Sequence, residues 1–116
     1  MLSKLFGFLR GKGVIVKGVD KLPEGQAKVI DIGDPLAGGK QVVLCRVGGK
    51  LYAVDRLCPH EGGRLIEGPL AEKQYVVCPL HNYRFDPKSG AAVGVACKSA
   101  TTYKVEMNGN DCEIFV

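Results

Sequence analysis

Short stretches in which apolar and polar residues alternate, separated by glycine-containing turns, make up most of the chain. The clearest example is a hairpin whose strands, at residues 40–47 and 50–55, flank a Gly-Gly turn. Successive side chains of a strand point to opposite faces, so Val43 and Cys45 share one face of the first strand. This pattern predicts an antiparallel β protein rather than a helical one.

Further strands are predicted on both sides of this hairpin, where β-branched and apolar residues concentrate. Their expected bounds are residues 14–19, 26–32, 101–107 and 112–116. The last two form a second hairpin, and residues 56–90 carry two loops of different composition. A chain of 116 residues has the usual length of one domain, which we place at residues 14–116.

Residues 1–13 have the periodicity of a helix instead. Apolar residues recur at helical spacing with cationic residues beside them, namely Leu2, Leu5, Phe6 and Leu9 with Lys4, Arg10 and Lys12. Such an amphipathic extension could contact a membrane through residues 1–12, or dock on a partner. Isolated helices of this length are marginal in water, which favours the alternative that it packs on its own domain or frays.

Charge and hydropathy exclude several classes of protein. The net charge of +4 is small, and no cluster of Lys and Arg is dense enough to indicate nucleic-acid binding. No run approaches the ~20 apolar residues that span a bilayer, and the first residues lack the cleavage site of a secretory signal. We therefore expect a cytoplasmic protein with a weak preference for an acidic protein partner.

Both histidines of the chain lie in short loops, each beside a cysteine. The first loop contains Cys58 and His60 in the sequence Cys-Pro-His, and the second contains Cys78 and His81 in Cys-Pro-Leu-His. A thiolate and a neutral imidazole from each loop are typical metal ligands. The spacing therefore predicts a metal centre built from two loops.

The sequence between the two loops allows them to meet. Residues 64–70 and 74–78 are predicted to be two strands joined by a short turn. Such a strand pair would place both loops side by side at one end of a sheet, where binding residues are commonly found.

Three kinds of metal centre use cysteine and histidine together. A structural zinc ion accepts two of each, but its cysteines usually come in closely spaced pairs, which this chain lacks. A blue copper site needs two histidines and one cysteine, so one cysteine would be unused. A [2Fe–2S] cluster with two cysteines on one iron and two histidines on the other uses all four residues.

The sequences LCPHEGG at 57–63 and VCPLHNYRFD at 77–86 resemble the Rieske iron–sulfur motif, and the similarity extends over residues 14–116. This resemblance implies an all-β, Rieske-type fold of three small antiparallel sheets. The cluster-binding subdomain, at about residues 56–90, would lie at the tip.

The resemblance also implies the ligands and the chemistry. Cys58 and Cys78 would bind one iron of a single [2Fe–2S] cluster, and His60 and His81 would bind the other. With two neutral imidazoles the oxidised centre is neutral, whereas a four-cysteine cluster is negatively charged. An added electron therefore meets less repulsion, and the potential is higher than in four-cysteine ferredoxins.

Among Rieske proteins, this chain is expected to have a low potential. Members from respiratory quinol-oxidising complexes have serine and tyrosine hydroxyls where this chain has Tyr83 and Phe85. Phe85 has no hydroxyl to donate, so we expect a potential near the low end of the range, about −150 mV. Those members also have a disulfide, whose two positions are occupied here by Gly63 and Leu80.

The implied function is that of a Rieske ferredoxin, a one-electron carrier between an NAD(P)H-dependent reductase and a terminal oxygenase. It would not be an enzyme itself, because a terminal oxygenase needs further histidines for a mononuclear iron, and this chain has none left. One alternative is the small subunit of an assimilatory nitrite reductase, bound to the large subunit. A zinc-binding interaction module is the alternative from another class.

Other residues near the loops have more than one interpretation. Asn82 stands where the family usually has glycine, and asparagine tolerates left-handed backbone. Three arginines flank the ligands and either face solvent or contact an acidic partner: Arg56, Arg64 and Arg84. Cys45 and Cys112 are expected to be small buried residues and Cys97 to be more exposed; none has a histidine available to make it a catalytic thiol.

Overall fold

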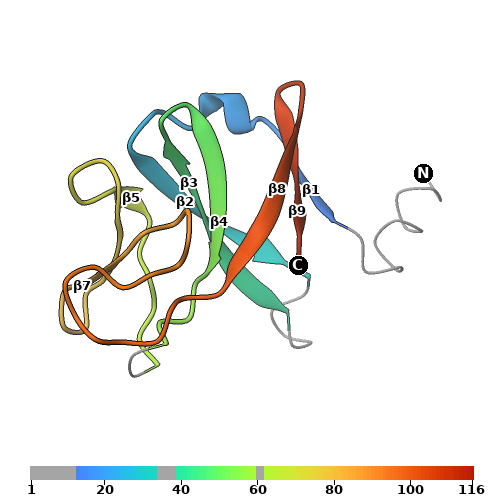
Figure 1. Ribbon diagram of the computed structural model, residues 1–116. Coiled ribbons are helices and arrows are strands. Elements are labelled where there is room, and N and C mark those ends of the chain that lie inside the picture. Colours follow the sequence, from blue (N-terminus) through green and yellow to red (C-terminus); the bar gives the residue numbers. More distant parts are fainter. Residues whose placement is uncertain (1–12, 34–38, 60–61) are drawn as a thin grey trace.

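The computed structural model describes residues 13–33, 39–59 and 62–116, and most regular structure in them is β-strand (Figure 1). The elements are β1 (Val14–Val16), the 3-10 helix η1 (Val19–Lys21), β2 (Gln26–Ile32), β3 (Lys40–Val47), β4 (Lys50–Asp55), β5 (Gly68–Pro69), β6 (Val76–Cys78), β7 (Tyr83–Phe85), β8 (Thr102–Asn108) and β9 (Asp111–Phe115). Within these residues no helix is long and apolar enough to cross a membrane. The stripe predicted at residues 1–12 lies outside them.

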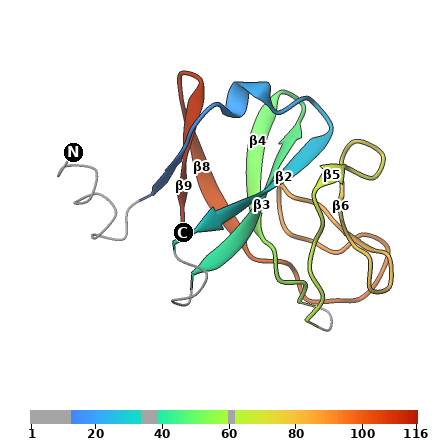
Figure 2. The same ribbon diagram turned by 180° about the vertical axis from the view of Figure 1, so that it is seen from behind.

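The strands form three small antiparallel groups. One contains β1, β9 and β8, and another contains β4, β3, β2 and β5; together they make a curled sheet in the order β1-β9-β8-β4-β3-β2-β5. Two residue pairs of the strand ladder join these groups, Ala53–Tyr103 and Val54–Thr102. The third group is the β6–β7 hairpin, which lies on the side of the molecule away from β1 and β9 (Figures 1 and 2). The all-β fold predicted from the sequence is confirmed.

Strand β3 is buried on both faces and separates two apolar clusters. Val43 and Cys45 belong to one cluster, and Val42 and Leu44 belong to the other. The first cluster also contains both predicted cysteine ligands and Phe85, whereas the second lies against η1 and β9. The alternation predicted along this strand is confirmed, and it attaches the ligand loops directly to the core.

Most strand bounds agree with the sequence-based prediction. Strands β2, β3 and β4 have the predicted ends, while β8 and β9 are each displaced by one residue. β1 is shorter than the predicted 14–19 and stops at Val16. Gly18 has a left-handed backbone (φ 67°), which turns the chain out of the strand and into η1.

The prediction that residues 64–70 and 74–78 form a strand pair is wrong. Of the first segment only β5 is a strand, and it pairs with β2, while β6 pairs with β7. Pro69 has no N–H to give to a ladder, which limits pairing at this point. The two segments still touch, because the Ile66 N–H donates a hydrogen bond to the Val77 carbonyl oxygen (3.0 Å).

Candidate metal centre

The structure places the two predicted ligand loops close to each other. Cys58 follows the end of β4, Cys78 is the last residue of β6, and His81 lies in the turn between β6 and β7. In both views the segment after β4 runs beside this hairpin (Figures 1 and 2). His60 lies outside the described residues, so its role as a ligand stays a prediction.

The two cysteines are neighbours in the interior. Cys58 is 1% exposed and Cys78 is fully buried, within the same apolar cluster. Burial raises the pKa of the Cys78 thiol, the adjacent Cys58 raises it further, and the Leu80 backbone N–H lowers it. The Cys78 thiol therefore resists ionisation unless a cation compensates the charge, which a bound metal would supply.

The first loop is closed by backbone hydrogen bonds. The Cys58 N–H donates to the Gly63 carbonyl oxygen at 2.7 Å, and the Gly62 N–H donates to the Cys58 carbonyl oxygen at 3.3 Å. Before the cysteine, the Leu57 N–H donates to Oδ1 of Asp55 (2.9 Å). These bonds fix the backbone on both sides of Cys58 without using its thiol.

The second loop is a tight hairpin turn. Cys78 and Tyr83 are the last paired residues of β6 and β7, so His81 lies in the connection. Asn82 has φ 60°, which confirms that this position needs the left-handed backbone that asparagine tolerates. His81 is exposed, and its ring lies 6.3 Å from that of Tyr83. The hairpin therefore buries its cysteine and presents its histidine to solvent.

The donor chemistry fits a two-iron cluster, because Cys58 and Cys78 supply neighbouring thiols and His81 supplies an exposed imidazole. A tetrahedral zinc ion would need all its ligands around one point. A [2Fe–2S] cluster does not, because the cysteines and the histidines bind different iron ions.

The arginines near the ligands have different roles, which the sequence did not distinguish. Arg56 braces the first loop: its Nε donates to the Leu65 carbonyl oxygen (3.0 Å) and its guanidinium donates to Gln41 Oε1 (2.9 Å). Arg84 forms an ion pair with Glu72 (2.9 Å). The bracing role of Arg56 depends on contacts far apart in the sequence, so no local motif could have indicated it.

Three large apolar side chains near the ligand loops are exposed, and the sequence analysis did not identify them. Leu57, Ile66 and Leu80 are 56%, 42% and 47% exposed. Ile66 and Leu80 also line a shallow groove together with Arg64. Clustered exposed apolar side chains mark interaction surfaces. A signal was available in the sequence, since Leu57 and Leu80 each lie within two residues of a predicted ligand.

The three cysteines outside the ligand loops lie in or against the two apolar clusters. Cys45 and Cys112 are fully buried, as predicted, and burial raises their thiol pKa to about 12 and about 11. Cys97 is half-buried and packs against the cluster that holds the ligand cysteines. Cys97 is thus the most exposed of these three cysteines, as the sequence predicted.

Gly63 must stay without a side chain if Cys78 is to keep its place. A Cβ at this position would lie 2.7 Å from Cys78 Sγ and 3.3 Å from Leu80 Cβ. We expect Gly63→Ala to lower the iron bound per chain severalfold, because overpacking of about 1–3 kcal/mol falls directly on a ligand thiol. Iron and acid-labile sulfide assays of the purified protein measure this.

Gly62→Ala is the matched control. A Cβ at Gly62 meets nothing within 4 Å, although its φ of 75° adds backbone strain. Equal iron loss in the two variants would show that the loop backbone matters, and not the contact with Cys78.

Comparison with known proteins identifies the class. The family model of the Rieske [2Fe-2S] domain matches residues 12–106, and the chain therefore belongs to this family. The [2Fe–2S] cofactor expected from the two loops is that of the family, with one cluster per chain.

Within the family, the chain is similar to ferredoxins of oxygenase systems. It is 33% identical over 95 residues to the ferredoxin component of the alkene monooxygenase system of Xanthobacter autotrophicus, covering 80% of this chain and 74% of that protein. It is 37% identical over 90 residues to the ferredoxin component of the naphthalene 1,2-dioxygenase/salicylate 5-hydroxylase systems of Ralstonia sp, covering 77% and 81%. The solved ferredoxin of carbazole 1,9a-dioxygenase from Nocardioides aromaticivorans IC177 superposes with a TM-score of 0.74 at 28% identity, over 89% and 96%.

These relatives decide between the functions that the sequence left open. The chain is a Rieske-type electron-transfer protein and not an enzyme in its own right. The alternative of a nitrite reductase small subunit is not supported. A zinc-binding module is not supported either, because the matching family is defined by an iron–sulfur cluster.

Proposed function

We propose that this ferredoxin passes single electrons from an NAD(P)H-dependent reductase to a terminal oxygenase in the cytoplasm. The observation that carries the proposal is the pair of buried, neighbouring thiols of Cys58 and Cys78 beside the exposed His81. Its relatives include ferredoxin components of a monooxygenase system and of dioxygenase systems. The bound cluster supplies a one-electron redox step at a potential that suits such a relay.

In this proposal the four ligands are Cys58, His60, Cys78 and His81. Cys58 and Cys78, which are buried among apolar side chains, would hold one iron of the cluster, and the histidines would hold the other. His81 is exposed, so a docked partner would approach the ligand set through this residue.

The partner surface is formed by the exposed side chains around the loops. Leu57, Ile66 and Leu80 supply apolar contact area, and Arg64 supplies a positive charge at its edge. Apolar contact with a charged rim suits a transient complex, because charge steers the encounter while the small apolar area permits release. Arg56 is bound to Leu65 and Gln41 and contributes to the loop rather than to the partner.

Reconstitution tests the proposal. The purified ferredoxin is mixed with NADH and the reductase of a naphthalene dioxygenase-type system, and cluster reduction is followed by EPR. Addition of the cognate oxygenase and its substrate should then give product formation that depends on the ferredoxin. A rhombic reduced signal with slow or absent transfer to the oxygenase would preserve the cluster assignment but contradict the partner assignment.

The ligand role of His81 makes a separate prediction. His81→Cys replaces a neutral imidazole by a thiolate and adds a negative charge to the centre, so the potential should fall. Spectroelectrochemical titration of both proteins, with EPR to confirm an intact cluster, measures the change. A variant that assembles its cluster at an unchanged potential would argue against His81 as a ligand.

A further inference from the structure

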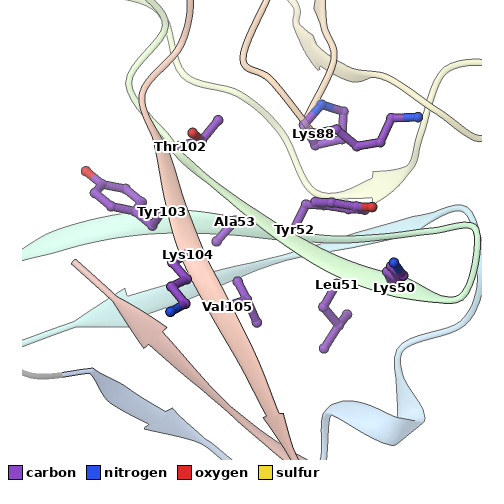
Figure 3. A pocket seen from close by; sticks show the side chains of 10 residues that line it. Lys50, Leu51, Tyr52, Ala53, Lys88, Thr102, Tyr103, Lys104 and Val105 are labelled. Atoms are coloured by element: carbon purple, nitrogen blue, oxygen red, sulfur yellow. The ribbon is translucent and has the colours of Figure 1, made fainter.

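A wedge-shaped cleft opens between β4 and β8. After the two residue pairs that join them, the strands diverge: β4 is paired with β3 on its other side, and β8 with β9. The cleft lies between Lys50–Ala53 and Thr102–Val105, with Pro87 and Lys88 at its rim, and has a volume of about 510 Å³. Figure 3 shows these side chains around the opening.

The chemistry of this β4–β8 cleft is apolar inside and cationic at the rim. Three apolar side chains line the interior of the cleft: Leu51, Ala53 and Val105. Three lysines lie at its rim and carry positive charge: Lys50, Lys88 and Lys104. Lys104 is paired with Glu106 (3.1 Å), whereas Lys50 and Lys88 form no ion pair among the described residues. Among the residues that the structure describes, no acidic side chain lines the cleft. The rim therefore carries positive charge that is not neutralised locally.

The backbone of the two strands that border the cleft can also form hydrogen bonds with a bound segment. On the cleft side, neither the first half of β4 nor the part of β8 after Tyr103 has a strand partner within the described residues. Such edges present N–H and C=O groups to which an extended segment can add as a further strand. Side chains of an added strand alternate, so one row would face the apolar floor and the other the lysines.

We propose that the β4–β8 cleft binds an extended, acidic segment of a partner polypeptide. The lysines complement carboxylates, and the free strand edges complement an extended backbone. The chain's own residues 1–12 are a poor occupant, because Lys4, Arg10 and Lys12 would add positive charge to a cationic rim. A nucleic acid is also a poor occupant, because a narrow apolar floor with three lysines offers few phosphate contacts.

The cleft is separate from the metal centre but on the same strand. β4 runs from Lys50 at the cleft to Asp55, from which the chain continues to Cys58. Neither Leu57 nor Leu80 is among the residues that line the cleft, so a short segment bound there need not cover these two side chains. A partner anchored there by a tail would be held at a high local concentration beside the ligand loops. Binding of such a segment is distinct from electron relay and can be measured without any redox partner.

The experiment measures peptide binding to the cluster-containing protein. The probe is a fluorescein-labelled decapeptide of alternating Glu and Val, followed by fluorescence anisotropy at low and at physiological salt. The cleft variant is Lys50→Glu/Lys88→Glu. The matched control is Lys21→Glu/Lys28→Glu, which changes the net charge equally at exposed positions on η1 and β2.

We expect the cleft variant to weaken binding by roughly tenfold or more, and the control by no more than about twofold at physiological salt. Hydrogen exchange should show protection of backbone amides in residues 50–53 and 102–105 when the peptide is bound. Methylation of alternate peptide nitrogens should weaken binding if the segment adds as a strand. Equal losses in both double variants, or no measurable binding by the unchanged protein at low salt, would overturn the proposal.

Discussion

Replacing Cys78 by serine is expected to leave the protein without its [2Fe–2S] cluster. The thiol is fully buried beside Cys58, so no water or solvent-exposed donor can take its place. Changes in residues that only support metal ligands already cost roughly 10–100-fold in affinity, and loss of a ligand should cost at least as much. Iron, acid-labile sulfide, visible absorption and EPR of the reduced protein measure the loss.

Cys97→Ser is the control for this prediction. Cys97 is half-buried and packs against the same apolar cluster, but lies in neither ligand loop. It should retain the full cluster and the unchanged EPR spectrum. A Cys78→Ser protein with normal iron and sulfide would contradict the ligand assignment, because a serine hydroxyl is a weak substitute for a thiolate at iron.

The scaffold could be predicted from the sequence wherever local pattern and turn chemistry agree. The strands at 26–32, 40–47 and 50–55 have the predicted ends, since regular alternation is bounded by glycines with left-handed backbone, including Gly33 (φ 78°) and Gly48 (φ 61°). The segment 64–70 could not be predicted in this way. Its partners are set by tertiary contacts with β2, and local pattern carries no information about them.

The candidate site shows the same division. The two Cys-Pro sequences marked Cys58 and Cys78 as ligands, but their proximity was expected from a strand pair at 64–70 and 74–78 that does not form, since β6 pairs with β7 instead. The bracing of the first loop by Arg56 was not predictable, because its two acceptors, on Gln41 and Leu65, come from different segments. Short sequence motifs identify the candidate ligands, whereas the residues that hold the ligand loops in place come from distant parts of the chain.

The support of the ligand loops leads to the second prediction: Phe85→Ala should destabilise the protein by about 3–5 kcal/mol. Among the described residues Phe85 is the largest fully buried side chain, and it belongs to the apolar cluster that contains Cys58 and Cys78. Its removal leaves a cavity in the apolar cluster that contains both ligand cysteines. Denaturant unfolding, followed by circular dichroism for the sheet and by visible absorption for the cluster, measures the change.

Phe115→Ala provides the comparison for this cavity. Phe115 is half-buried on β9, in the strand group remote from the β6–β7 hairpin (Figures 1 and 2). Phe115→Ala should lower the free energy of unfolding by less than Phe85→Ala does. In this variant the absorption of the [2Fe–2S] cluster should be lost together with the sheet. In Phe85→Ala the absorption should be lost at a lower denaturant concentration than the sheet, because the cavity lies in the apolar cluster that contains Cys58 and Cys78. Equal losses of stability in the two variants, with the cluster and the sheet lost together in both, would mean that Phe85 has no special part in holding the site.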